Sequence, residues 1–326
     1  MQRRALIRLA GGLGAVTASR GARAQTVEPY PIRPVKIVVG FPPGQASDTI
    51  ARMLAAKLTE ALGQSFIVDN KPGAAGIVAH EAVKNGRSDG YTLLVGSTAT
   101  LAVNPSLYRK LPYDPLKDFV PVALLISSPT YLIASPALPV GGYREFVTYA
   151  RERPGKMSYA SAGAGTSSHI VMEAFKKREG LDIVHVPFRG SPAAMASVQS
   201  GDTPIAFETA TAATPQAQAG RIRVLATTAA TRTAQFPNAP ALVEELRDFV
   251  FVPWAAMIAP AGTPAPIVET LNAAINRALQ EKEMQTFVTS IASVTRAGTP
   301  GELEKFMQNE LAIWGEAVRT SGATLD

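Results

Sequence analysis

Short apolar runs alternate with amphipathic stretches along most of this chain. The first run, 35–39, has the length of a buried strand, and Ile50, Leu54 and Leu58 then share one face of a helix that should end at Gly63. The same patterns predict strands at 65–69, 91–96, 158–161, 183–186, 205–207 and 224–227, and helices at 74–85, 167–178 and 193–200. Strands separated by helices are typical of βαβ units. We therefore predict an α/β fold with mainly parallel sheets flanked by helices.

Two apolar passages break this alternation. Residues 120–126 and 131–134 are strand-like with no helix between them, and 249–259 is a second such run further along the chain. Two lobes joined by crossover strands require one such passage from the first lobe to the second and another that returns to the first. A helix that begins after Thr263 and a final helix at 300–321 then complete the pattern.

These patterns divide the chain into three parts. We predict a signal peptide at 1–24, a first lobe formed by 25–123 together with 250–326, and a second lobe formed by 124–249. A chain of 326 residues is long enough for two lobes, each with a sheet and a core of its own.

The net charge of +6 comes mostly from the N-terminal segment. Residues 1–24 have five arginines and no acid, and without them 27 basic residues face 26 acidic ones. A basic start, an apolar stretch over 6–18 and the A-x-A site Ala22-Arg23-Ala24 are typical of a cleavable signal peptide, and Arg3-Arg4 resembles a twin-arginine signal. The alternative is a basic, frayed N-terminus on a cytoplasmic protein. The nearly neutral remainder lacks the positive field that nucleic-acid binding requires, so we expect an exported, periplasmic protein that binds no nucleic acid.

Four strand ends carry glycines and hydroxyl side chains where open α/β sheets bind ligands. Three strand-to-helix turns stand out, at 41–49, 161–169 and 207–211, and 96–100 is a further hydroxyl-rich strand end. Free N–H groups at the start of a helix attract a carboxylate or phosphate. Two ends come from each predicted lobe, so we expect all four to face one cleft. The candidate ligand-binding residues are Phe41, Gly44, Gln45, Ala46, Ser47, Asp48, Thr49, Ser97, Thr98, Ser161, Gly163, Gly165, Thr166, Ser167, His169, Phe207, Glu208 and Thr209.

Other chemistries fit these turns less well. The first turn alone could be an ordinary capped βα turn, with Ser47 or Asp48 as the cap. The second imitates a dinucleotide fingerprint, but Ser168 stands where the third glycine belongs, which favours a small-anion site. A small-molecule hydrolase using Ser167 and His169 is the alternative function, although residues two apart on a helix point in different directions. Cysteine is absent and the three histidines lack metal-ligand spacing, so we predict no catalytic residue, metal or cofactor.

Ordered motifs along nearly the whole chain resemble one family. Residues 30–39 followed by Phe41-Pro42-Pro43-Gly44 are similar to the mature start of the Bug-type solute receptors, the extracytoplasmic binding proteins of tripartite tricarboxylate transporters. Further matches lie at 70–76, 89–94, 104–108, 111–115, 159–163, 166–169, 185–191 and 259–264. Together the matches extend from about residue 28 to residue 326.

The resemblance implies a two-lobed periplasmic binding protein (type II-like) that closes on a small organic acid. In this family the loops matching 41–49 and 161–169 hold one carboxylate through backbone N–H groups, hydroxyls and bridging waters. The implied ligand is a dicarboxylate, an amino acid or an aromatic carboxylate, and the implied partners of the monomer are membrane permease subunits or a sensor. Gln45 stands where the family usually has a second glycine, and Glu208 where it more often has Asp or Asn, so we expect both to influence the choice of ligand.

Overall fold

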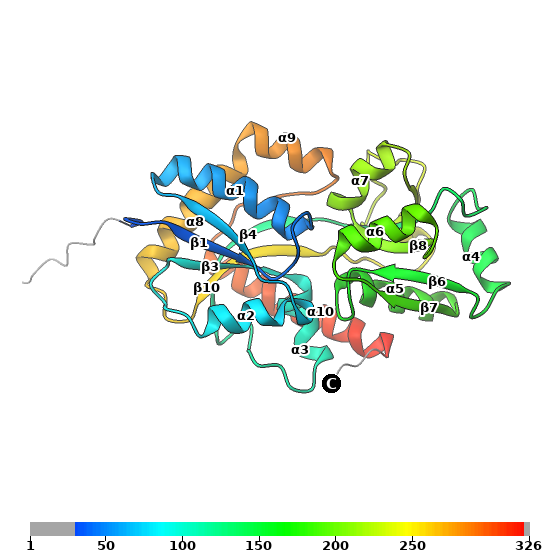
Figure 1. Ribbon diagram of the computed structural model, residues 1–326, viewed down its shortest axis with the longest axis horizontal. Helices are drawn as coiled ribbons and strands as arrows, with labels where there is room; N and C mark the ends of the chain where they lie inside the picture. The colour runs from blue at the N-terminus through cyan, green and yellow to red at the C-terminus, as the bar shows by residue number, and fades with distance from the viewer. Residues whose placement is uncertain (1–29, 323–326) are drawn as a thin grey trace, which may run out of the picture.

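The structure, a computed structural model, describes residues 30–322. The predicted signal peptide, 1–24, lies outside these residues. The described strands form two five-stranded sheets, which lie one after the other along the length of the molecule (Figure 1). No helix in this range is both long and apolar enough to cross a membrane.

The strand order is analogous in the two sheets. The first sheet has the order β2 (Phe66–Asn70), β1 (Val35–Val39), β3 (Thr92–Ser97), β10 (Trp254–Pro260) and β4 (Phe119–Ser127). The second sheet has the order β7 (Ile183–Pro187), β6 (Met157–Ser161), β8 (Ile205–Thr209), β5 (Thr130–Ala134) and β9 (Arg223–Thr227). Each sheet thus places the strand that starts its βαβ units second from one edge.

Both sheets are mixed, with one strand in each that runs against the other four described strands. β1 pairs in parallel with β2 and β3, whereas β10 is antiparallel to β3 and β4. In the second sheet β6 is parallel to β7 and β8, and β5 is antiparallel to β8 and β9. In each sheet four of the five described strands therefore run in the same direction, which agrees with the prediction of mainly parallel sheets. The fifth strand, β10 or β5, enters its sheet without a preceding crossover helix, so nothing turns it parallel to the βαβ strands.

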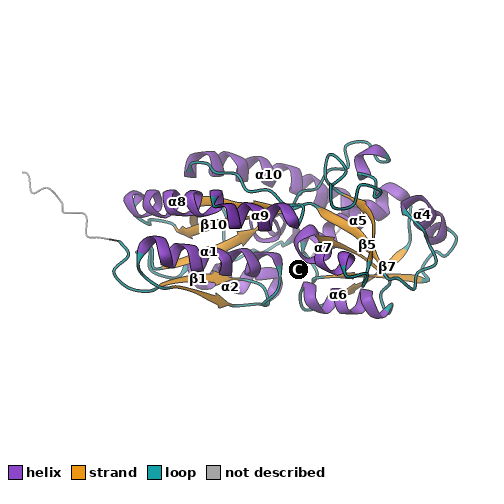
Figure 2. Cartoon of the chain, turned by 90° about the horizontal axis from the view of Figure 1, so that it is seen from above, coloured by secondary structure: helices purple, strands orange, loops and turns teal. Residues whose placement is uncertain are grey.

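Helices cover both faces of each sheet (Figure 2). On the first sheet, apolar side chains of β1 at alternate positions pack on one face against α1 (Ala46–Leu62), α8 (Ala265–Gln280) and α9 (Lys282–Ser290). The opposite face packs against α2 (Ile77–Lys84), α3 (Asn104–Leu107) and α10 (Pro300–Ser321), with the short turns η1 (Ala74–Gly76) and η2 (Ala99–Val103) beside them. On the second sheet, α6 (Ser191–Ser200) and α7 (Ala210–Gln218) cover one face, and α4 (Tyr143–Arg151) and α5 (Ser167–Glu179) the other.

The final helix joins the two halves of the molecule. Leu303 and Trp314 of α10 belong to one buried cluster that contains Phe119 of the first sheet and Phe207 of the second. The chain passes between the sheets at 128–129, immediately after β4. The predicted limit between the lobes at 123/124 falls inside β4, so the exact division stays a prediction.

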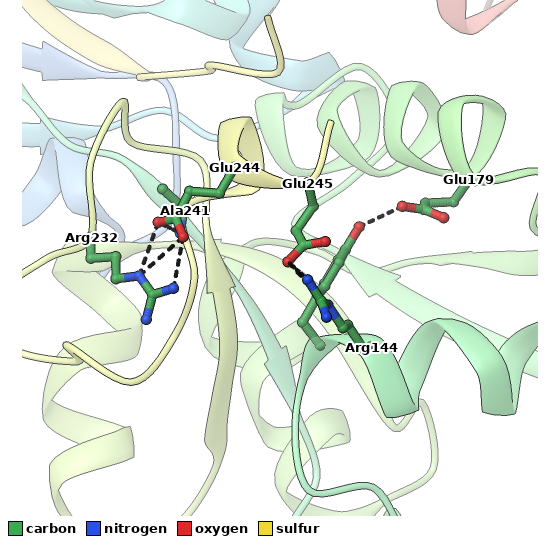
Figure 3. A network of polar contacts seen from close by, with 7 residues as sticks. Arg144, Glu179, Arg232, Ala241, Glu244 and Glu245 are labelled. Carbon is green, nitrogen blue, oxygen red and sulfur yellow. Dashed lines mark hydrogen bonds and ion pairs between the residues drawn. The ribbon is translucent and has the colours of Figure 1, made fainter. Parts of the chain in front are cut away.

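Polar contacts within the return passage, 228–253, and from it to α4 are drawn in Figure 3. The passage contains one short turn, η3 (Leu242–Glu244), where Glu244 accepts a hydrogen bond from the Ala241 N–H at 3.0 Å and pairs with Arg232 at 2.7 Å. Next to it, Glu245 pairs with Arg144 of α4 at 3.0 Å. Exposed ion pairs such as these contribute little energy each.

Candidate functional site

The turn between β1 and α1 leaves the start of α1 without a side-chain cap. Gly44 has a φ of +84°, and the extended Gln45 is the N-cap residue, but its side chain makes no capping hydrogen bond. Asp48, predicted as a possible cap, instead accepts hydrogen bonds from the Gly44 N–H at 2.9 Å and from Arg52 at 3.0 Å. Burial alone would raise the pKa of Asp48, but these bonds and one from Asn70 outweigh it and lower the pKa.

The turn between β6 and α5 likewise leaves the start of its helix without a side-chain cap. Gly163 and Gly165 have φ values of +134° and +80°, which let the chain turn tightly before Ser167. The N-cap residue, Thr166, donates its hydroxyl to the Gly163 carbonyl at 2.7 Å and makes no side-chain capping bond to α5. The Ser168 hydroxyl accepts from the Ala162 N–H at 3.1 Å.

A third helix begins at the site, at the strand-to-helix turn predicted over 207–211, although no bounds for this helix were predicted. Thr209 ends β8 and is the N-cap of α7. Its side chain makes no capping bond either. Glu208, 4% exposed, accepts a hydrogen bond from the Thr209 N–H at 2.8 Å, and burial raises the pKa of its carboxyl.

The three helix starts converge on a small cavity, here called the inner cavity, of about 60 Å³. Its lining comes from both sheets, and none of its described lining residues is charged. Two buried polar atoms in this lining, Gln45 Oε1 and Ser97 Oγ, have no hydrogen-bond partner. The Thr98 hydroxyl, in contrast, accepts a hydrogen bond from the Trp254 N–H at 2.7 Å. Lining residues are Phe41, Gln45, Ala46, Ser47, Ser97, Thr98, Ala99, Ile126, Ser128, Thr166, Ser167, Thr209, Pro253, Trp254 and Ala255.

A larger cavity, the outer cavity, of about 680 Å³ adjoins the inner one. Phe41 and Thr166 line both. The rest of its lining is mostly glycine, alanine, proline and aromatic side chains, with Arg189 at an exposed position. Its lining residues are Gly40, Phe41, Pro42, Pro72, Gly73, Ala74, Ala75, Gly76, Tyr108, Ala162, Gly163, Ala164, Thr166, Phe188, Arg189 and Gly190.

The two halves touch beside these cavities. A Cβ atom added at Gly190 would lie 3.0 Å from Pro42 Cγ, and one added at Gly44 would lie 3.7 Å from Pro192 Cγ. The start of α1 therefore faces the start of α6 across the boundary between the halves, as Figure 1 shows.

Half of the predicted site residues line the inner cavity, and Gly163 lines the outer one. Gly44 and Thr49 line a third cavity of about 480 Å³, on the side of the loop that faces α6, α7 and α9. The remaining predicted residues line none of these three cavities; they are Asp48, Ser161, Gly165, His169, Phe207 and Glu208. Of these, Phe207 is a core residue and Gly165 donates its N–H to His169 Nδ1 at 3.2 Å.

Side chains that a hydrolase would need are engaged elsewhere. The His169 ring stacks on His185 with centroids 4.2 Å apart, and burial lowers the pKa of His169. His185 Nε2 in turn lies 2.6 Å from Ser161 Oγ, and its pKa falls to about 4, first through burial and then through His169. Ser167 lines the inner cavity, whereas His169 and His185 do not. Among residues 30–322 no cluster of three His, Asp or Glu side chains could hold a metal ion.

The sequence profile of a family described as a tripartite tricarboxylate transporter family receptor matches residues 50–323. This chain belongs to that family. BugT of Bordetella pertussis is 34% identical over 323 residues, covering 98% of this chain and 99% of its own length.

Solved structures agree with the assignment. Rpa4515 of R. palustris, solved with adipate, superimposes with a TM-score of 0.88 at 32% identity and covers 91% of this chain and 100% of its own. MatC of Rhodopseudomonas palustris, solved with malate, superimposes with a TM-score of 0.84 at 32% identity and covers 89% of this chain and 100% of its own. The protein is therefore a solute-binding protein of the periplasmic binding protein class, and this family is a family of receptors, not of enzymes. The family resemblance and the two-lobed α/β fold class predicted above are confirmed.

Proposed function

We propose that this receptor captures a small organic carboxylate between its two lobes. The observation that carries the proposal is the convergence of three helix starts, α1, α5 and α7, none of which is capped by its N-cap side chain, on the inner cavity. Each helix start presents free N–H groups and about half a positive charge. An anionic group is the ligand that such a site prefers, and the relatives solved with adipate and malate support a carboxylate.

The binding mechanism is hinge closure. The first lobe, proposed as 25–123 with 250–326, contributes the start of α1, and the second, proposed as 124–249, contributes the starts of α5 and α7. Since no single lobe carries the whole site, the closed state makes contacts that the open state lacks, and ligand shifts the population toward closure. The proposed ligand-binding residues are those predicted from the sequence.

The receptor is exported and passes its ligand to a partner in the membrane. The closed receptor, a monomer exported with a cleavable signal peptide at 1–24, delivers its ligand to permease subunits of the tripartite tricarboxylate type or to a sensor. Peptide sequencing of the periplasmic protein should give a mature start at or near Gln25; a retained Met1 on cytoplasmic protein would contradict export. Replacing both Arg3 and Arg4 with lysine should block export if the twin-arginine route is used.

Calorimetry tests carboxylate capture directly. Adipate, malate and aspartate would be titrated into the mature protein, with adipamide as an uncharged control of the same length as adipate. We expect at least one acid to bind with 1:1 stoichiometry, the amide to give no heat, and the ligand to be recovered intact after denaturation. Tight binding of the amide would refute the anion site, and consumption of the ligand would favour the hydrolase.

A further inference from the structure

The turn between β6 and α5 contacts two stacked histidine rings. We infer that His169 and His185 form a positioning pair, which keeps this turn in the shape that capture of the solute requires; the inference rests on the proposed function above. Neither ring lines any of the three cavities described above, so the pair acts through the turn. His169, one of the proposed ligand-binding residues, thus contributes to binding indirectly.

Strand register and the start of α5 bring the two rings together. Tyr159 of β6 and His185 of β7 are direct partners in the parallel register, and their ring centroids lie 4.8 Å apart. His169, in the first turn of α5, stacks on His185 with the ring planes only 12° apart. The Tyr159 hydroxyl donates to the Glu173 carboxylate of α5 at 2.5 Å. The orientation of each ring is therefore fixed by a neighbour on another element.

Each ring is also linked to the backbone of the turn. The Gly165 N–H donates to His169 Nδ1 at 3.2 Å. The Gly163 N–H donates to Ser161 Oγ at 3.2 Å, and this hydroxyl lies 2.6 Å from His185 Nε2. Gly163 and Gly165 have a positive φ, a conformation that the lack of a side chain permits but does not enforce. The two rings therefore hold the residues on which the geometry of the turn depends, and with it the direction of the first free N–H groups of α5.

The pair must be uncharged to hold the turn. A neutral imidazole has one acceptor nitrogen, whereas a protonated one has only donors. Because His169 Nδ1 accepts from a backbone N–H, the hydrogen of this ring lies on Nε2. Burial lowers the pKa of both histidines, and that of His185 falls to about 4 through burial first and then through His169. Of the other groups that face the pair, Glu173 raises and Lys176 lowers both pKa values, while burial raises the pKa of Tyr159. Burial prevails, so both rings are neutral at pH 7.

Variants that keep or remove an acceptor test the inference by calorimetry with adipate and malate. His169→Asn places an amide oxygen near the position of Nδ1, so it should bind these acids within about threefold of the parent. His169→Phe keeps a flat ring for the stack but leaves the Gly165 N–H without a partner, so it should weaken binding about tenfold. His185→Gln and His185→Phe should differ in the same way, because the amide of glutamine can replace Nε2 beside Ser161. The control is Phe146→Leu, a core change on α4, which should lower the melting temperature and leave the affinity unchanged.

Amide hydrogen exchange in the ligand-free protein gives a second readout, which does not depend on the proposed function. Exchange at Gly165 should be at least about fivefold faster in His169→Phe than in the parent, because this amide loses its acceptor. In His169→Asn it should be nearly unchanged. A general loss of stability would instead accelerate many amides of the same half of the molecule, which is the pattern expected of Phe146→Leu.

The outcomes separate the inference from the proposed function. Phenylalanine variants that bind adipate and malate as tightly as the parent would overturn the inference and leave carboxylate capture intact. Equal losses in His169→Asn and His169→Phe would also overturn it, because the acceptor would then be irrelevant. Failure of the parent to bind adipate, malate or aspartate would refute the proposed function, while exchange at Gly165 would still decide whether the pair holds the turn.

Discussion

Replacing Ser167 with aspartate should abolish ligand binding without unfolding the protein. Ser167 is the first residue of α5 and lines the inner cavity, so the new carboxylate would occupy the position proposed for the ligand's own. A carboxylate in the first turn of a helix is favourable for the helix, by about 0.3–1 kcal/mol. The fold should therefore tolerate the change.

The magnitude follows from two contributions. The ligand would lose at least one charge-assisted hydrogen bond from the start of α5, worth about 1.5–3 kcal/mol, which corresponds to a factor of about 10 to 150 in Kd. Two like charges about 4 Å apart also repel by about 4 kcal/mol at an effective dielectric constant of about 20. Together these contributions amount to about 5.5–7 kcal/mol, so we expect Ser167→Asp to weaken binding by about 10⁴-fold or more.

Calorimetry with Ser167→Asn as the matched control separates charge from size. Asparagine has nearly the shape of aspartate and also caps helices, but it carries no charge. Ser167→Asn should weaken binding by less than about tenfold, and Ser167→Ala by about fivefold, the loss of one neutral hydrogen bond. If the aspartate and asparagine variants bind within twofold of each other while both remain folded, the ligand's carboxylate does not lie at the start of α5.

Three further predictions concern stability and the binding signal. Gly76→Ala should lower the free energy of unfolding in urea by about 2 kcal/mol or more, because Gly76 has a φ of +87° and a Cβ there would lie 2.6 Å from a threonine methyl; Gly301→Ala, in open space on α10, should not. Because burial raises the pKa of Glu208, the stability of the parent should fall as pH rises from the ordinary carboxyl pKa to the folded one, and Glu208→Gln should lack this fall in urea melts at pH 4 and pH 8. Of the two tryptophans, Trp254 lines the inner cavity, so ligand should change the fluorescence of Trp314→Phe but not of Trp254→Phe.

Local periodicity predicted most elements well. β1 and α10 have the predicted bounds, and most other predicted elements match to within about two residues, because each has a buried face that repeats along the sequence. The turn into α7 was predicted but its extent was not, since its buried side chains are small, among them Ala210 and Ala213, and Pro215 lies inside it. α4 does carry a signal that could have found it, with Phe146, Val147 and Ala150 on one face. α8, the helix after Thr263, begins one residue later than expected, with Pro264 as its N-cap residue. The Thr263 hydroxyl donates a hydrogen bond to the Pro260 carbonyl and does not cap α8.

Strand direction and the composition of the site depend on contacts that are distant in sequence. An apolar run such as β10 has the same pattern whether it pairs in parallel or antiparallel, so nothing local distinguishes a mixed sheet. Trp254 and Ser128 line the inner cavity because β10 and the passage after β4 lie beside the ends of β3 and β8. No motif marks either residue.

The absence of charge among the described residues of the inner cavity has a consequence for a receptor that must also release its ligand. An arginine in the cavity would attract a carboxylate in the open and the closed state alike. Helix starts act within about one turn, so the dipole of α1 reinforces those of α5 and α7 only when closure of the proposed lobes brings all three around the same anion. Glu208, buried directly before α7, fits this design, because burial raises the pKa of its carboxyl and so favours the uncharged form, which repels an anion less. Affinity is therefore coupled to closure, and opening of the lobes is sufficient to release the solute.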